Sequence, residues 1–239
     1  MVDLELDQEL AVITIDRPHA RNAIAPETMD QLEKALDAAA GAKALVIRGG
    51  GDRAFVSGGD LKELSKLRTE EQAADMARRM RSICDQVANF PAPVVAALNG
   101  HALGGGAEFA VAADIRVAAD DIKVGFNQVT LAIMPAWGGA ERLAELVGRG
   151  RALMLAGSGT VLDAAEAERF GLVDRVLPRD SFEEGWRSLA RSLANGPAGE
   201  IKRVMAGASA PEAVAAFARL WIADEHWAAA GKVLNRGKS

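Results

Sequence analysis

Asn99-Gly-His-Ala-Leu-Gly-Gly-Gly-Ala-Glu-Phe109 and Ala54-Phe-Val-Ser-Gly-Gly-Asp-Leu-Lys-Glu-Leu64 are the two glycine-rich segments on which the interpretation of this chain turns. Each follows a predicted strand, and the later segment also opens a predicted helix. The first N–H groups of a helix lack partners within it, and glycine allows a ligand close to the backbone. Two such loops can direct N–H donors at one oxygen, which is what an oxyanion hole requires. The alternative is that both are only helix-capping turns.

Neither segment has the spacing of GxGxxG, GxxxxGK[ST] or GxSxG. These two segments therefore lack the signature motifs of dinucleotide-binding, P-loop and serine-hydrolase proteins. A nucleotide-binding α/β domain of another kind stays as an alternative.

The sequence on either side of these segments alternates between strands and helices. Apolar, β-branched runs predict strands, and apolar residues at helical spacing predict helices. The strands are expected at 10–16, 44–48, 93–98 and 115–118, and the helices from 25 onward and at 61–66, 69–87 and 107–113. This alternation predicts a parallel α/β core with right-handed crossovers.

The character of the chain changes after about residue 180. Residues 182–193, 198–205 and 211–230 have helical patterns, with no strand between them. We therefore expect two regions, an α/β core at 1–180 and a C-terminal helical region at 181–239 that covers the core or mediates assembly.

Composition excludes several classes of protein. The 239 residues are 49% hydrophobic and 26% charged, with a net charge of −5, which argues against disorder and against binding to nucleic acid. One cysteine and three separated histidines match no metal site. No apolar run reaches the about 18 residues of a membrane span, and the acidic N-terminus is not a signal peptide. We expect a cytoplasmic protein that binds no membrane.

The pairing and order of these motifs resemble the crotonase family, also called the enoyl-CoA hydratase/isomerase family. The resemblance covers nearly the whole chain. It rests on the turn at 17–23 (RPHARNA), on the two glycine-rich segments, on Asp114-Ile-Arg116 and on the region 126–143, which contains Pro135-Ala-Trp-Gly-Gly139 and Arg142-Leu143.

This resemblance implies a spiral core of repeated ββα units and a homotrimer or homohexamer built by the C-terminal helices. It implies an acyl-CoA substrate, with coenzyme A as part of that substrate and with no metal or redox cofactor. The N–H groups of Gly59 and Gly105 would form the oxyanion hole for the thioester oxygen. Residues along the adenine and pantetheine path would be Ala23, Ser57 and Leu61. Lys62 would contact a CoA phosphate or be a solvated helix charge.

Glu108 follows Gly105 by three residues, so its carboxylate is expected near the same opening, where it can move a proton next to the thioester. The alternative is a helix N-terminal acid favoured by the dipole. The family's hydratases use a second glutamate, and Gln128 stands at that position here. An amide orients water or a substrate carboxylate but is not a base. His101 approaches the thioester or bonds to the backbone, and Trp137 walls the acyl pocket or packs in the core.

The leading hypothesis is a lyase that acts through a thioester enolate. Decarboxylation of an ethylmalonyl- or methylmalonyl-type CoA ester is an alternative, because it needs only one proton donor. The segments at 104–109 and 134–139 resemble the family's ethylmalonyl-CoA decarboxylase branch. A non-catalytic acyl-CoA-binding protein of the same fold is the remaining alternative.

Overall fold

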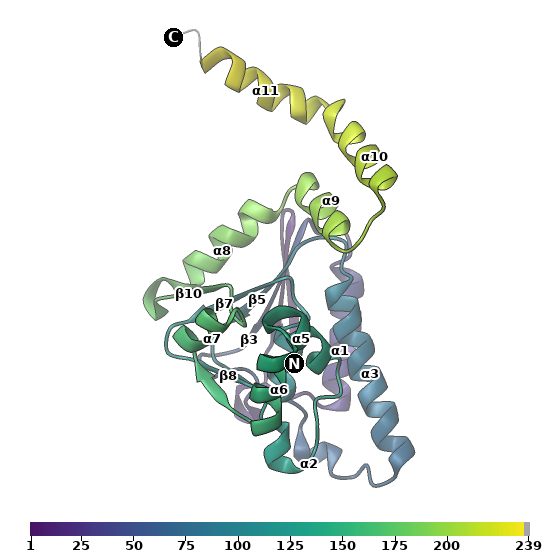
Figure 1. The fold of residues 1–239 in the computed structure, drawn as a ribbon, viewed down its shortest axis with the longest axis vertical. Coiled ribbons are helices and arrows are strands. Elements are labelled where there is room, and N and C mark those ends of the chain that lie inside the picture. The colour runs from purple at the N-terminus through teal and green to yellow at the C-terminus, as the bar shows by residue number, and fades with distance from the viewer. Residues whose placement is uncertain (237–239) are drawn as a thin grey trace.

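A computed structural model describes residues 1–236 and contains two sheets (Figure 1). The larger one has six strands in the order β1 (Val2–Asp7), β2 (Leu10–Ile15), β3 (Ala44–Gly49), β5 (Val94–Leu98), β7 (Ile115–Ala119) and β10 (Arg175–Leu177). The smaller one has the order β4 (Ala54–Val56), β6 (His101–Leu103), β8 (Lys123–Gly125) and β9 (Val161–Asp163). The predicted α/β crotonase-like class is confirmed.

The central strands of the large sheet are parallel, as the sequence predicted, and their side chains are buried on both faces. The sequence analysis missed β1, which pairs antiparallel with β2 at the sheet edge. Its acids alternate with apolar residues, and half of it is exposed. That pattern is typical of an edge strand.

Helices cover the large sheet. α1 (Pro26–Ala38) and α3 (Glu70–Ala88) lie side by side, and α8 (Phe182–Leu193) packs against β3, β5 and β7 (Figure 1). Trp186 of α8 is fully buried in the core. The helix α3 begins where its sequence indicates, because the Thr69 hydroxyl and the Gln72 side chain cap each other's backbone N–H groups.

The small sheet brings the two glycine-rich segments together. β4 and β6 are parallel neighbours, so the loops at their carboxyl ends meet at one edge. The first loop leads into α2 (Leu61–Leu64) and the second into α4 (Gly105–Ala110). An added Cβ at Gly58 would lie 3.1 Å from the backbone nitrogen of Gly105. The predicted start of α4 at 107 was two residues late, because its first turn is made of glycines.

The remaining elements carry the chain around this pair of sheets. They are η1 (Pro18–Ala20), η2 (Gln128–Leu131), α5 (Gly139–Val147), α6 (Arg149–Ser158), α7 (Ala164–Phe170), η3 (Arg179–Ser181), α9 (Gly196–Met205), α10 (Ala210–Trp221) and α11 (Asp224–Arg236). No helix within residues 1–236 has both the length and the apolar character needed to cross a membrane.

The helices α10 and α11 lead away from the body of the molecule, whereas α9 stays against it, where Lys202 pairs with Asp114 at 2.7 Å (Figure 1). The prediction of one helix at 211–230 was wrong, because the chain breaks between α10 and α11. Asp224 and Glu225 suit the positive end of a new helix. The rings of Trp221 and His226 then pack across the break, with centroids 4.7 Å apart. Residues 237–239 of the predicted C-terminal region lie outside the described chain.

Candidate active site

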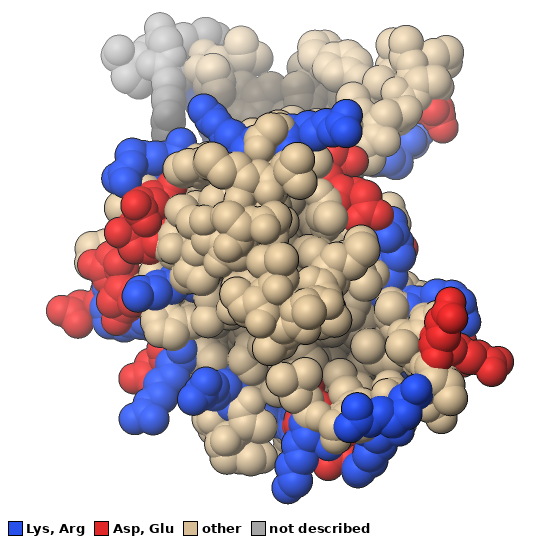
Figure 2. All heavy atoms as spheres, turned by 60° about the horizontal axis from the view of Figure 1, so that its bottom comes forward, with Lys and Arg blue, Asp and Glu red and all other residues tan. Residues whose placement is uncertain are grey.

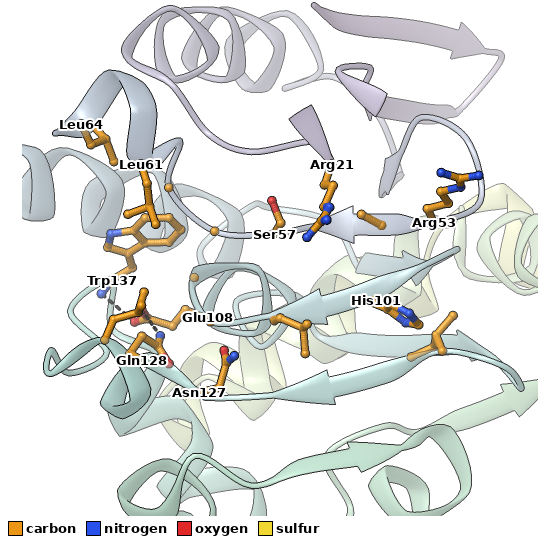
Figure 3. A pocket seen from close by; sticks show the side chains of 18 of the residues that line it. Arg21, Arg53, Ser57, Leu61, Leu64, His101, Glu108, Asn127, Gln128 and Trp137 are labelled. Atoms are coloured by element: carbon orange, nitrogen blue, oxygen red, sulfur yellow. Dashed lines mark hydrogen bonds between the residues drawn. The ribbon is translucent and has the colours of Figure 1, made fainter. Parts of the chain in front are cut away.

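A cavity of about 1020 Å³ lies where the two glycine-rich loops meet. Its wall includes eight residues that the sequence analysis singled out, from four parts of the chain: Ser57, Gly59, Leu61, His101, Gly105, Glu108, Gln128 and Trp137. Ala23 and Lys62 are not part of this wall. Figure 3 shows the cavity with the side chains of its labelled residues.

The backbone leaves the amides of Gly59 and Gly105 free of helix and bridge hydrogen bonds. Gly105 is the first residue of α4, so no helical carbonyl precedes it to accept its N–H. Around Gly59, the neighbouring groups bond to Ile24: Ile24 N–H donates to Gly58 O, and Asp60 N–H donates to Ile24 O, both at 2.8 Å. The N–H of Gly59 therefore points away from Ile24. Both glycines border the cavity, as an oxyanion hole requires.

Trp137 forms the wall beside these two amides. Its indole ring lies so close to Gly105 that a Cβ there would be 2.5 Å from Cη2, and a Cβ on Gly59 would be 3.9 Å from Cζ2. The residue is only 6% exposed. Trp137 is therefore packed into the core and also borders the cavity, and its role as a wall of an acyl pocket stays a prediction. Its ring requires glycine at position 105.

Glu108 projects from α4 and is 2% exposed. Its carboxylate accepts four hydrogen bonds. Oε2 accepts from the N–H groups of Trp137 (2.7 Å) and Gly139 (3.1 Å). Oε1 accepts from Ala136 N–H (3.3 Å) and from Gln128 Nε2 (2.8 Å). The turn at 135–139 thus wraps its amides around one carboxylate, and glycine at 139 is needed because a Cβ would collide with Glu108 Cγ.

Burial raises the pKa of the Glu108 carboxyl above its ordinary value, although the hydrogen bonds from Trp137, Gly139, Gln128 and Ala136 act in the opposite direction. A carboxyl group whose pKa is moved toward neutrality, at the wall of a cavity, is suited to giving and taking protons. Glu108 is therefore more buried, and accepts more hydrogen bonds, than an acid that only stabilises a helix N-terminus needs.

Gln128 lies at the start of η2 and is 6% exposed. Its Nε2 donates to Glu108, while its Oε1 is buried with no hydrogen-bond partner. A buried unpartnered acceptor is unfavourable and calls for a donor, such as water or a substrate group. The family resemblance gave Gln128 the position of a second glutamate, and the structure brings it into direct contact with Glu108.

Charged side chains gather at the other end of the cavity, where the arginines accompany two acids, Asp52 and Asp121. In Figure 3, Arg21, Arg53 and His101 lie on the far side of Ser57 from Glu108 and Trp137. His101 is exposed on β6, and its Nδ1 accepts from Lys123 N–H at 3.1 Å, which matches the backbone-bonded alternative. The sequence analysis did not single out Arg21 or Arg53. Arg21 stood within the quoted turn at 17–23, which was the available signal.

Two predicted binding residues lie elsewhere. Ala23 is buried, and its carbonyl oxygen accepts from Arg17 Nη1. Lys62 is exposed on α2. Arg17 also pairs with Asp60 at 3.0 Å, and Asp60 caps α2 by accepting from Glu63 N–H. Burial opposes ionisation of Asp60, but Arg17 and the cap outweigh it and lower its pKa. Asp60 is therefore a structural cap of α2.

The comparisons with known proteins agree with this geometry. The family model described as "Enoyl-CoA hydratase/isomerase" matches residues 5–219. A Bacillus subtilis protein named "Probable enoyl-CoA hydratase" is 39% identical over 81% of this chain and 76% of its own length. The mouse "Methylglutaconyl-CoA hydratase, mitochondrial" is 37% identical over 79% of this chain and 60% of its own length.

Solved structures give the same result. An enoyl-CoA hydratase from Thermoplasma volcanium superposes with a TM-score of 0.87 at 30% identity, over 97% of this chain and 96% of that one. An enoyl-CoA hydratase from Bacillus anthracis gives a TM-score of 0.84 at 30% identity, over 92% and 89%. The chain is an enzyme of the lyase type, and it belongs to the enoyl-CoA hydratase/isomerase family.

Proposed function

We propose that this protein is an acyl-CoA lyase that adds water to, or removes it from, a 2-enoyl-CoA thioester through an enolate. The observation that carries the proposal is the arrangement of Gly105 and Glu108 on one short helix. The first N–H of α4 borders the same cavity as the carboxylate one turn later. Gly59, from the neighbouring loop, supplies the second N–H donor beside it.

The proposed hydration consists of two proton transfers by Glu108 with an enolate between them. In hydration, Glu108 takes a proton from water while the water oxygen bonds to the β-carbon. The double-bond electrons move onto the thioester oxygen, where the N–H groups of Gly59 and Gly105 stabilise the negative charge. The enolate then collapses, and the α-carbon takes the proton from Glu108. The net change is one water added across one double bond.

The arginines at the far end of the cavity suit the remainder of the substrate. Arg21 and Arg53 provide positive charge for the phosphates of coenzyme A, and Ser57 and Leu61 border the path between them and the oxyanion hole. The roles of Ala23 and Lys62 as CoA-binding residues stay predictions, because neither borders this cavity.

Decarboxylation of a malonyl-type CoA ester is a second candidate, favoured by one observation. Gln128 occupies the place beside Glu108 where a second carboxylate would serve hydration. In decarboxylation the bond to the departing CO2 breaks, its electron pair forms the enolate, and protonated Glu108 delivers one proton to the α-carbon. No second acid or base is needed.

Mass spectrometry of CoA esters separates these candidates. The protein is incubated separately with crotonyl-CoA, methylmalonyl-CoA and ethylmalonyl-CoA. A gain of water on crotonyl-CoA supports the hydro-lyase, and a loss of CO2 supports the decarboxylase. Glu108→Gln is expected to abolish the reaction while the esters still bind, with Glu145→Gln on the exposed side of α5 as the control. Binding without any turnover by the unmodified protein would favour the non-catalytic alternative.

The assembly is also a proposal. Apolar side chains remain exposed on α10, on α11, in the break between them, on the segment after Gln128 and on α6; they include Phe217, Ile222, Val233, Leu131, Ile133, Met134, Leu153 and Met154. Figure 2 shows a broad area without charged residues, bordered by charged ones. Such surfaces mark contacts between proteins. We expect a homotrimer or homohexamer in light scattering, with the region after residue 180 contributing to it, and a monomer would contradict this.

A further inference from the structure

Arg142 belongs to the Arg142-Leu143 pair of the region 126–143, and the proposed function gives it no role. It lies in the first turn of α5, and it is not among the residues that border the cavity. Its side chain is nevertheless only 17% exposed. A long cation held in this way has specific partners, and they identify what it does.

The guanidinium joins two segments. Nη2 pairs with Asp85 of α3 at 2.5 Å, and Nη1 donates to the carbonyl oxygen of Trp137 at 3.2 Å. Gly138 makes room for it, because a Cβ at that residue would collide with Nη1. Gly138 also has a φ of +85°, a conformation that favours glycine. The turn is therefore built to receive this side chain.

Trp137 is held from both sides as a result. Its N–H donates to Glu108 Oε2 at 2.7 Å, and its C=O accepts from Arg142. Its ring meanwhile packs against Gly105. A change in the orientation of this one residue would disturb the strongest turn contact to the carboxylate and the wall beside the oxyanion hole together.

We propose that Arg142 is a positioning residue: anchored by Asp85, it fixes the Trp137 peptide so that the 135–139 turn keeps its N–H groups on Glu108. It acts through the turn and touches neither substrate nor the reacting atoms. The role of Glu108 in turnover rests on the proposed function, whereas the contacts that Arg142 makes do not.

The chain offers a matched control. Arg81 pairs with Glu141 at 2.7 Å and also joins α3 to α5, but it does not contact the turn. Arg81→Gln therefore removes a similar ion pair between the same two helices. Any effect of Arg142→Gln that comes only from loosening these helices will appear in both variants.

The test is a titration of Glu108 by NMR of protein labelled with ¹³C at the glutamate carboxyl carbons. The Glu108 signal is identified by its absence from Glu108→Gln. In Arg142→Gln we expect the pKa of Glu108 to rise by about half a pH unit or more, because its amide donors are no longer held in place. Arg81→Gln is expected to leave it unchanged. Turnover in Arg142→Gln is expected to fall about 10- to 100-fold in kcat, with little change in KM.

Two further variants separate positioning from charge and from unfolding. Arg142→Lys keeps the charge but not the two-pronged geometry. The pKa of Glu108 in this variant should therefore return less than half of the way to its value in the unmodified protein. Asp85→Asn removes the anchor and should shift the pKa in the same direction as Arg142→Gln, which keeps the test decisive if the latter fails to fold. An unchanged Glu108 pKa, equal effects of Arg81→Gln, or full restoration by lysine would overturn the proposal. Absence of turnover with a shifted pKa would contradict the proposed function alone.

Discussion

Gln128 and Glu108 are joined by a 2.8 Å hydrogen bond from Nε2 to Oε1, and this bond completes the surroundings of the carboxylate. A carboxylate has about four acceptor positions, and all four donors are present here. Three are backbone N–H groups of one turn, and the fourth is a side chain that can rotate. Access of water or substrate to Oε1 therefore depends on Gln128.

Substitution of Gln128 tests this relationship. Gln128→Leu removes the hydrogen-bond donor to Glu108, so the pKa of Glu108 should rise further. It also removes Gln128 Oε1, so a bound water should lose the acceptor of its hydrogen bond. We expect hydration to fall at least tenfold, the loss typical of one positioned polar group. Gln128→Glu supplies a second carboxylate and should raise hydration of crotonyl-CoA instead. Measurement of kcat with crotonyl-CoA checks both, and equal losses in the two variants would contradict the orienting role.

The pH dependence of turnover has opposite signs for the two candidate reactions. A hydratase needs ionised Glu108 to accept the proton of water, so kcat/KM should fall as the pH drops through the pKa of Glu108. Because burial raises that pKa, the fall should begin above the ordinary glutamic acid value of about 4.3. A decarboxylase that protonates the enolate from Glu108 should lose activity as the pH rises instead. A profile from pH 4 to 9 decides, and a flat profile would argue against both roles for Glu108.

Methyl groups on Gly59 and Gly105, the two glycines proposed for the oxyanion hole, should have unequal effects. At Gly105 a Cβ would overlap the ring of buried Trp137, whereas at Gly59 it would meet the end of the flexible Leu64 side chain at 2.5 Å. Gly105→Ala should therefore cost about 1–3 kcal/mol of unfolding free energy, more than Gly59→Ala. It should also reduce kcat about 100-fold or more.

Gly41→Ala is the control, because no atom lies within 4 Å of a Cβ there. Thermal unfolding and steady-state kinetics measure the two effects. A Gly105→Ala variant with ordinary stability and turnover would show that the ring of Trp137 moves freely, against the tight packing described.

The arginines at the far end of the cavity predict a loss of substrate affinity that occurs only when the substrate contains the coenzyme A nucleotide. Arg21→Ala and Arg53→Ala should each raise KM for a CoA thioester several-fold, because a charge-assisted contact to phosphate is lost. Neither should affect the matching N-acetylcysteamine thioester, which has no phosphate. Arg151→Ala on α6, outside the cavity wall, is the control. An equal rise in KM for both thioesters would show that these arginines do not act through the phosphates.

The sequence by itself determined the class of fold and pointed to most of the residues proposed for catalysis. Apolar β-branched runs specify buried parallel strands because only such residues fill both faces of a covered sheet. Gly59, Gly105 and Glu108 lie close in sequence to strand ends, so local pattern singled out the segments that contain them, and the family resemblance supplied their proposed roles. The absence of a carboxylate at Gln128 was equally legible, since residue type alone decides whether a side chain is a base.

Contacts between distant segments were decided only by the tertiary structure. Three such contacts define the site, and each joins residues far apart in the chain. Glu108 accepts four hydrogen bonds, Trp137 packs on Gly105, and Arg142 links Asp85 to the turn. The break between α10 and α11 was missed for a related reason, because the aromatic rings that pack across it lie on both helices. The strand β1, by contrast, has a local pattern that indicates an edge strand. Packing fixes such partners because each depends on where the backbone of another segment runs.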